Sequence, residues 1–219
     1  MEQIKVDETI FIGDKESRLY RHQSRALYNA IEHYARSNRG FISHCCRSGK
    51  TYTSIAIANN LKSKNTIVFC NSIHLIQQTL EDWKPNIQNH EILCVASDST
   101  LNNEYPEIQN PTTCPKKIKK FLRKPKNKLV ISTYDSSKKV HEAISGTDIK
   151  FDLLVADEAH HTVGIGDFQS RFVHFDEYIP ATNRLYMTAT RRIVGKKLKK
   201  RLDDVLCVSM DDIHVYGDE

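Results

Sequence analysis

The chain has 219 residues, 39% of them hydrophobic and 27% charged, which is typical of a globular protein with a sizeable buried core. No apolar run approaches the roughly 20 residues of a transmembrane helix, and the first residues lack the basic-then-apolar pattern of a secretory signal. The net charge is +5 and the six cysteines show no metal-ligand spacing, so we expect an intracellular protein with reduced thiols.

Strands and helices alternate along the predicted structure. In chain order we expect a strand at residues 9–12, a helix at 19–35, a strand at 40–44, a helix at 50–61, a strand at 66–70, a helix at 73–83, a strand at 91–96, a helix at 115–123, a strand at 129–133, a helix at 136–144, and strands at 151–156, 184–188 and 205–209. The stretch 97–113 is polar, with Asn and Pro, and predicts a loop.

Apolar strands that alternate with helices indicate a mostly parallel sheet covered on both faces, an α/β fold. In such sheets ligands bind beyond the carboxyl ends of the strands. Neither a repeat nor a linker is visible, so we expect one domain over residues 18–219, with residues 1–17 packed on it as an N-terminal extension.

The segment HCCRSGKT at residues 44–51 contains what a phosphate-binding loop needs. It follows a predicted strand, turns at Gly49, and opens a helix with Lys50 and Thr51. Backbone N–H groups and the positive end of such a helix hold phosphates, the lysine reaches the β and γ oxygens, and the threonine hydroxyl ligates Mg²⁺. The alternative is an ordinary turn before a helix.

The segment DEAH at residues 157–160 supplies an acidic pair at the end of another predicted strand, 107 residues after Lys50. Asp157 is suited to hold Mg²⁺ and Glu158 to orient a water molecule, although the same string also occurs at a solvated helix start. Together the two segments indicate a site that hydrolyses a nucleoside triphosphate.

Basic residues are concentrated in two stretches. Eight of the thirteen residues 116–128 and seven of the eleven residues 191–201 are Lys or Arg. Each stretch is either a solvated helix face or, in a nucleotide-driven motor, a contact to the phosphate backbone of a nucleic acid.

With these positions placed, the chain resembles the first RecA-like domain of a superfamily 2 helicase or translocase. Six motifs carry the resemblance: LYRHQ at residues 19–23, the phosphate loop at 46–51, the strand and turn at 68–77, VISTY at 130–134, DEAH at 157–160 and TAT at 188–190. The sequence around residues 112–136 and 209–217 resembles the corresponding sequences of restriction-type helicases and of helicases from large DNA viruses and phages.

The resemblance implies a RecA-like three-layer sandwich that uses ATP and Mg²⁺. It implies catalytic roles for Lys50, Asp157, Glu158 and His160, with Thr51 and Asp157 as Mg²⁺ ligands. The implied nucleotide contacts are Gln23, which reads adenine, and Arg47, Ser48, Gly49, Lys50, Thr51 and Tyr52. The implied nucleic-acid contacts are Asn71, Ser72, Thr133 and Tyr134, and Thr188 and Thr190 couple hydrolysis to movement.

Some of these assignments have alternatives. Many relatives carry Gly where Arg47 stands, so this side chain either points outward or adds a phosphate contact. Gln23 could be a solvated surface residue, and the two threonines could be hydrogen-bonded core residues. The usual Pro after the TAT motif is Arg191 here.

The resulting hypothesis is an N-terminal ATP-binding domain that couples hydrolysis to movement on, or unwinding of, DNA or RNA through sequence-independent backbone contacts. A motor of this class needs a second RecA-like domain, for which the chain has no room after residue 217, so we expect weak activity from this piece alone. The competing hypotheses are a nucleic-acid-binding adaptor with little turnover and a P-loop kinase or metabolic ATPase.

Overall fold

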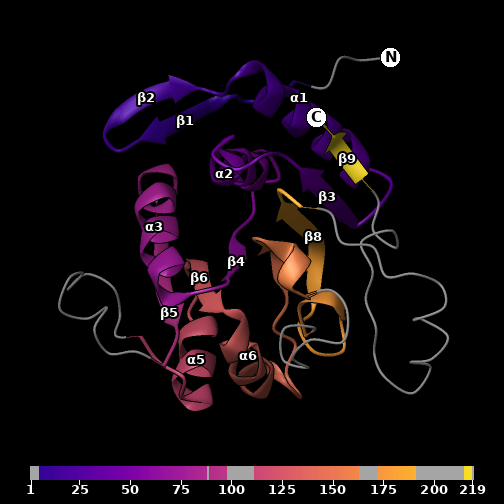
Figure 1. Cartoon of the computed structure of the whole chain (residues 1–219). Helices are drawn as coiled ribbons and strands as arrows, with labels where there is room; N and C mark the ends of the chain where they lie inside the picture. Colours follow the sequence, from indigo (N-terminus) through magenta and orange to yellow (C-terminus); the bar gives the residue numbers. More distant parts are fainter. Residues whose placement is uncertain (1–4, 88, 98–110, 163–171, 191–214, 219) are drawn as a thin grey trace, which may run out of the picture.

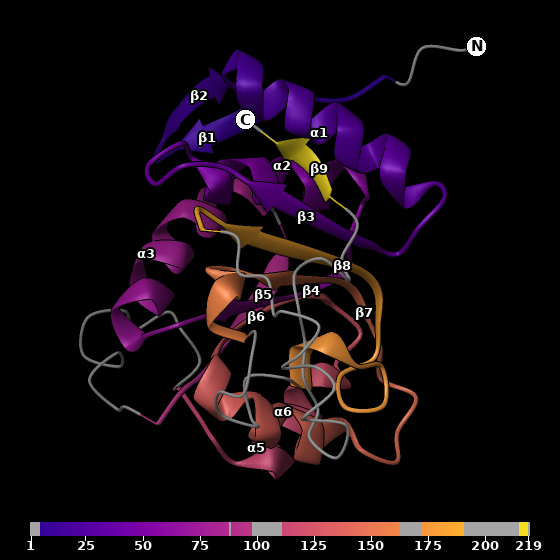
Figure 2. The same cartoon turned by 45° about the vertical axis from the view of Figure 1, so that its right-hand side comes forward.

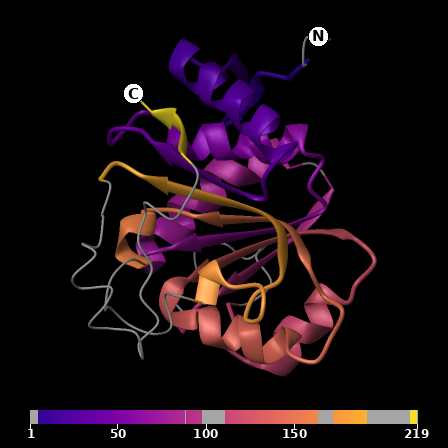
Figure 3. The ribbon, with the colours of Figure 1, turned by 90° about the vertical axis from the view of Figure 1, so that its right-hand side faces the viewer.

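A seven-stranded parallel sheet runs through the middle of the protein (Figures 1 and 3). The computed structural model describes residues 5–87, 89–97, 111–162, 172–190 and 215–218. The sheet order is β5-β6-β4-β7-β8-β3-β9. Its strands are β3 (Arg39–Ser43), β4 (Asn65–Cys70), β5 (His90–Val95), β6 (Asn127–Thr133), β7 (Phe151–Ala156), β8 (Ala181–Thr188) and β9 (Val215–Asp218).

Helices cover both faces of the sheet, which confirms the predicted three-layer α/β architecture (Figure 3). One layer holds α1 (Arg21–Tyr34), α2 (Lys50–Asn60) and α3 (Ile73–Trp83), and the other holds α5 (Pro115–Leu122) and α6 (Ser137–Ile144). Short 3₁₀ turns are found at η1 (Lys84–Asn86), η2 (Tyr134–Ser136) and η3 (Ala159–Thr162).

The central strands are apolar on both sides because each side faces a helical layer. In β4, Val68 and Cys70 join the core under α1–α3, whereas Ile67 and Phe69 join the core under α5 and α6. The helices are apolar on one face only; α5, for example, buries Ile118, Phe121 and Leu122.

A two-stranded hairpin, β1 (Thr9–Ile12) and β2 (Lys15–Arg18), packs on the α1–α3 layer (Figure 1). Ile10 is 2% exposed and belongs to the core. Two asparagines hold the backbone of this segment. The amide of Asn60 accepts from Asp7 N and donates to Asp7 O, both at 2.8 Å, and the amide of Asn86 accepts from Phe11 N at 2.7 Å and donates to Phe11 O at 2.8 Å.

The structure differs from the predicted elements at three places. β2 was not predicted because its sequence, KESR, has no apolar residue. The first helix begins at Arg21 and not at residue 19, because Leu19 N donates to Glu8 O at 3.1 Å and Tyr20 is extended. β9, which pairs in parallel with β3 at the sheet edge beside α1, was also not predicted (Figure 2).

Three predicted features lie outside the described residues, entirely or in large part: the strand at 205–209, the basic stretch 191–201 and most of the loop at 97–113. The five cysteines in the described part of the chain form no disulfide with one another. No helix within the described ranges has the length and apolar character needed to cross a membrane.

Candidate nucleotide-binding site

The phosphate loop connects the end of β3 to the start of α2. Gly49 is the residue before α2 and has φ +78°, a left-handed conformation that glycine adopts without strain. A Cβ atom at this position would overlap Gln23 Nε2, so two independent constraints require glycine here.

Gln23 holds this loop from α1. Its side chain is 2% exposed, and Nε2 donates to Ser48 O at 2.9 Å and to Gly49 O at 3.2 Å. Its Oε1 accepts from Tyr20 N at 2.8 Å. His22 Nε2 also donates to Ser48 O, at 2.9 Å. The LYRHQ motif therefore anchors the phosphate loop, and reading of adenine by Gln23 stays a prediction.

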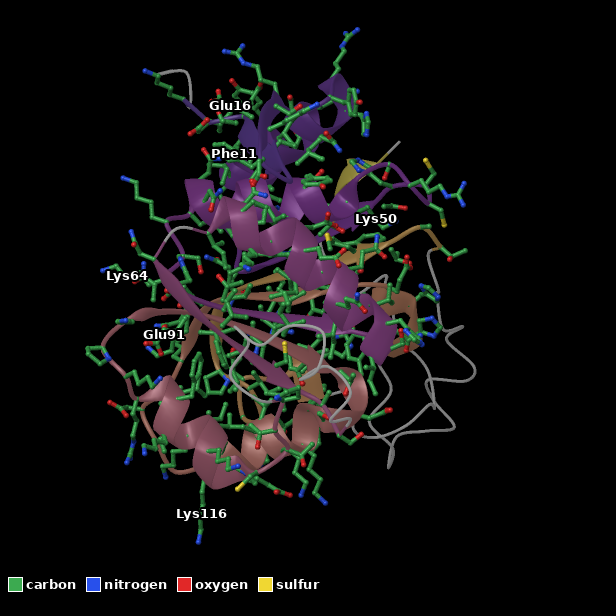
Figure 4. The ribbon with its side chains drawn as sticks, turned by 90° about the vertical axis from the view of Figure 1, so that its left-hand side faces the viewer. Phe11, Glu16, Lys50, Lys64, Glu91 and Lys116 are labelled. Atoms are coloured by element: carbon green, nitrogen blue, oxygen red, sulfur yellow. The ribbon has the colours of Figure 1, made fainter. Side chains whose placement is uncertain are left out.

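Lys50 joins the two motifs that lie 107 residues apart in the sequence. Its side chain is 9% exposed, and Nζ donates to the carbonyl oxygens of His44 at 3.4 Å and Cys45 at 3.3 Å. Nζ lies 3.9 Å from Glu158 Oε1. The ammonium thus lies between the phosphate loop and the acidic pair, at the carboxyl end of the sheet (Figure 4).

The acidic pair follows β7, where Asp157 N donates to Phe69 O of the neighbouring strand at 3.0 Å. Burial, together with the adjacent Glu158 carboxylate, raises the pKa of Asp157 to about 6. Glu158 N donates to Asp157 Oδ1 at 3.0 Å, and Glu158 has φ +47°. A non-glycine residue in this region is strained, and such strain is concentrated at functional sites.

His160 links the acidic pair to the end of β8. Its Nδ1 lies 3.2 Å from Glu158 Oε2 and 2.8 Å from Thr188 Oγ1. The Thr188 hydroxyl donates to Thr190 O at 3.0 Å and accepts from Thr190 N at 3.1 Å. The contact between His160 Nδ1 and Thr188 Oγ1 therefore joins the DEAH and TAT motifs in one hydrogen-bonded network.

The other predicted nucleotide contacts lie around the same loop. Arg47 is exposed and has φ +64°, a conformation in which glycine would be unstrained. The Ser48 hydroxyl is buried and makes no hydrogen bond within the described part of the chain. Thr51 lies in the first turn of α2, as a Mg²⁺ ligand requires. The Tyr52 hydroxyl is directed away from the loop and donates to Asp82 Oδ1 on α3 at 2.8 Å.

The predicted nucleic-acid contacts follow β4 and β6. Asn71 is exposed, and Ser72 caps α3 by accepting from Leu75 N at 3.4 Å. Thr133 Oγ1 donates to Ser136 Oγ at 3.0 Å. Tyr134 is 4% exposed and donates to Asp157 O at 2.7 Å, so its side chain connects the β6 turn to the acidic pair and leaves the backbone of the turn for phosphate.

Sequence reasoning missed two of these contacts. The Tyr134 hydroxyl bond to Asp157 O joins residues that are 23 positions apart, and the bond from His22 to Ser48 O joins residues 26 apart. The motif order indicated that both pairs meet at one edge of the sheet, but not which atoms touch.

Known proteins are similar to this chain in sequence and in fold. The family described as "Type III restriction enzyme, res subunit" (ResIII) matches residues 16–193. The chain belongs to this family. It is 32% identical over 182 residues to the protein named "Probable helicase A859L" of African swine fever virus, covering 81% of this chain and 20% of that protein. The chain thus spans about a fifth of the length of the curated relatives it matches.

Solved structures of two Type ISP restriction-modification enzymes are also similar to this ResIII chain. LlaBIII, described as ATP-dependent and bound to DNA, is 30% identical with a TM-score of 0.71, over 91% of this chain and 15% of that one. LlaGI, in complex with a DNA substrate mimic, is 28% identical with a TM-score of 0.71, and the match covers 90% of this chain and 19% of LlaGI. The chain is therefore a first RecA-like domain of the superfamily 2 helicase and translocase type, and the similarity to restriction-type and viral helicases is confirmed.

Proposed function

We propose that this ResIII domain is the N-terminal half of a DNA-dependent ATPase motor that couples ATP hydrolysis to movement along DNA. One observation carries the proposal: Lys50 lies 3.9 Å from Glu158, which is linked through His160 to Thr188, so the phosphate loop, the acidic pair and the TAT segment form one connected site. Two similar enzymes are described with DNA and one of them as ATP-dependent, which favours DNA and ATP.

The residues present fit a nucleoside triphosphate with Mg²⁺. Gly49 makes the left-handed turn of the loop, and α2 begins directly after it, so backbone N–H groups face the phosphate position. Asp157 is a half-buried carboxylate directly after β7, and Thr51 lies in the first turn of α2. Carboxylate and hydroxyl oxygens are the ligands that Mg²⁺ prefers, and a bound Mg²⁺ would neutralise phosphate charge during transfer.

Lys50, Glu158 and His160 each have a separate role in the proposed hydrolysis of ATP. Lys50 neutralises charge on the β and γ oxygens and keeps its ammonium between the phosphates and Glu158. Glu158 orients the attacking water and accepts its proton. His160 holds Glu158 on one side and Thr188 on the other, so a change at the hydrolysis site is passed to the end of β8.

A second RecA-like domain completes the proposed motor. Arginines from such a partner are worth roughly 10³–10⁵ in rate in related nucleoside triphosphatases, so the 219-residue chain alone is expected to hydrolyse ATP slowly. The turns at Asn71–Ser72 and Thr133–Tyr134 are proposed to contact the DNA backbone, which makes binding largely independent of sequence.

Two substitutions test the assignment. Lys50→Ala should abolish binding and hydrolysis of ATP, whereas Glu158→Gln should keep ATP binding and lower hydrolysis by about 10²–10⁴-fold. Lys62→Ala, which alters an exposed lysine after α2, is the matched control. Binding of a fluorescent ATP analogue and phosphate release, each with and without DNA or RNA, are the measurements. Unchanged turnover in both variants would refute the catalytic roles, and binding without any turnover in the wild type would favour the adaptor hypothesis.

A further inference from the structure

Residues 115–150 carry a large share of the positive charge of the chain. Residues 115–150 contain eleven Lys and Arg against three Asp and Glu, whereas the rest of the chain contains 21 against 24. This stretch forms α5, β6 and α6, and its two helices make the outer layer on one face of the sheet (Figures 1 and 3). The side of the sheet that carries α5 and α6 is therefore strongly basic.

Part of this charge is used inside the fold. Lys124 Nζ lies 2.7 Å and Lys126 Nζ 3.4 Å from the Glu91 carboxylate of β5. Lys128 is 5% exposed and donates to Lys126 O at 2.6 Å. Lys124 and Lys126 thus tie the turn between α5 and β6 to the edge strand β5, and Lys128 stabilises the turn itself.

The remaining charge on α5 is exposed. Lys116, Lys117, Lys120 and Arg123 all project from the outer face of the helix, opposite the buried Ile118, Phe121 and Leu122. We call these four residues the α5 basic row. None of them forms an ion pair with another residue in the described part of the chain. Figure 4 shows Lys116 extending away from the body of the protein.

This arrangement is unfavourable for the helix itself. Lys116 and Lys120 are four residues apart, and Lys120 and Arg123 are three apart, so both are pairs of neighbouring like charges. Lys116 and Lys117 also occupy the first turn of α5, where the helix dipole favours acidic residues. Alternating charges would stabilise this helix face, whereas an anion bound to these positions would relieve the repulsion between them.

We propose that the α5 basic row binds the phosphate backbone of duplex DNA, as a contact surface separate from the turns after β4 and β6. The proposal rests on the proposed function only in taking DNA as the partner of this domain. The row is close to the nucleic-acid turns in the fold, because the Thr133–Tyr134 turn leads into α6 and α6 packs against α5. Within residues 115–150 the acidic groups are Asp135, Glu142 and Asp148, and Glu142 is paired with Lys139 at 3.0 Å. Asp176 and Glu177 are exposed on the segment that packs against α6, and Asp176 is paired with Arg184 at 2.7 Å.

The chemistry of the row fits a duplex better than a single strand. Proteins that bind single strands combine positive charge with exposed aromatic rings on which bases stack. The exposed large apolar side chains in the described part of the chain are Ile12, Tyr20 and Tyr28, which lie in the N-terminal segment on the other side of the sheet. Exposed charge without a stacking platform is what a duplex backbone requires.

The test uses the 219-residue chain and a fluorescein-labelled blunt DNA duplex of mixed sequence. K116Q/K117Q/K120Q removes three charges of the row, and K15Q/R18Q/K62Q removes three exposed charges elsewhere. Each phosphate contact adds about 0.9 to the slope of log K against log salt, so three contacts add about 2.7. The advantage of the wild type over the row variant should therefore shrink by about 40-fold between about 50 and 200 mM salt.

A second readout is the melting temperature without DNA. The row variant should unfold at the same or a higher temperature than the wild type, because like-charge repulsion in α5 is removed. Weaker duplex binding with an unchanged or raised melting temperature, and wild-type binding by the control variant, would support the proposal. Wild-type affinity and salt slope in the row variant, an equal loss in the control, or no duplex binding by the wild type would each overturn it. Duplex binding through the row without DNA-stimulated ATPase would instead refute the proposed function alone.

Discussion

Replacement of Gly49 by Ala separates backbone strain from collision with Gln23. Gly146 provides the matched control, because it also has a left-handed φ, +67°, and a Cβ there would meet nothing within 4 Å. Gly146→Ala should therefore cost only the strain of a left-handed alanine, about 1–2 kcal/mol of the free energy of unfolding. Gly49→Ala carries the same strain at φ +78° and in addition displaces the Gln23 amide.

The extra cost follows from the contacts of Gln23. The amide makes three hydrogen bonds, to Tyr20 N, Ser48 O and Gly49 O, each worth about 1 kcal/mol net. Gly49→Ala should therefore cost about 3 kcal/mol more than Gly146→Ala. For a chain of this size the difference corresponds to about 6–12 °C in melting temperature.

Urea denaturation of a double-mutant cycle measures this directly. In a Gln23→Ala background the collision is gone, so Gly49→Ala should cost no more than Gly146→Ala. If Gly49→Ala and Gly146→Ala cost the same in the wild-type background, or if the extra cost persists without Gln23, the described contact between α1 and the phosphate loop is wrong.

Two further predictions concern titrating groups. Burial and the bond to Asp82 raise the pKa of Tyr52 from 10.0 to about 12, so wild-type stability should fall as the pH rises from 10 towards 12. The Tyr52→Phe variant should not show this fall, and its free energy of unfolding at pH 7 should be about 1 kcal/mol lower than that of the wild type. Its affinity for ATP should be unchanged. Weaker ATP binding would show that the Tyr52 hydroxyl contacts the nucleotide. Asp157 has its pKa raised from 3.8 to about 6, so without Mg²⁺ the folded state loses up to about 3 kcal/mol between pH 4 and pH 6. Asp157→Asn should therefore melt above the wild type at pH 7 in EDTA and at the same temperature near pH 4; equal melting temperatures at both pH values would contradict a desolvated carboxylate.

The central elements could be predicted because their sequence signals are strong. Strands such as β7, read as FDLLVA, are apolar on both faces, and only the interior of a parallel sheet between helices buries such a run. Because the carboxyl ends of parallel strands share one edge, the sequence also indicates that Lys50 and Glu158 meet. The observed separation of 3.9 Å is the expected result of that topology.

Atomic partners could not be predicted in the same way. Tyr52 follows the phosphate-loop threonine and was expected to contact nucleotide, but helical geometry places its hydroxyl against Asp82 of α3. In the sequence, residues 116–128 form one continuous basic stretch. In the structure, Lys124 and Lys126 form ion pairs with Glu91 of β5, whereas the α5 basic row is exposed. Both outcomes depend on a residue more than 25 positions away, which local patterns do not encode.

Asn60 and Asn86 hold the N-terminal segment through its backbone, which places few constraints on the sequence of that segment. The two side-chain amides hydrogen-bond to the backbone N–H and C=O groups of Asp7 and Phe11. Every residue except proline has both groups, so these four hydrogen bonds do not depend on the side chains at the two positions. Among the described residues 5–12, Ile10 is buried in the core and Val6 packs against it. A segment attached in this way can diverge while its place in the fold is kept, and the match to the ResIII family begins at residue 16, beyond β1. Relatives are therefore expected to carry an equivalent strand that is found by shape and missed by sequence alignment.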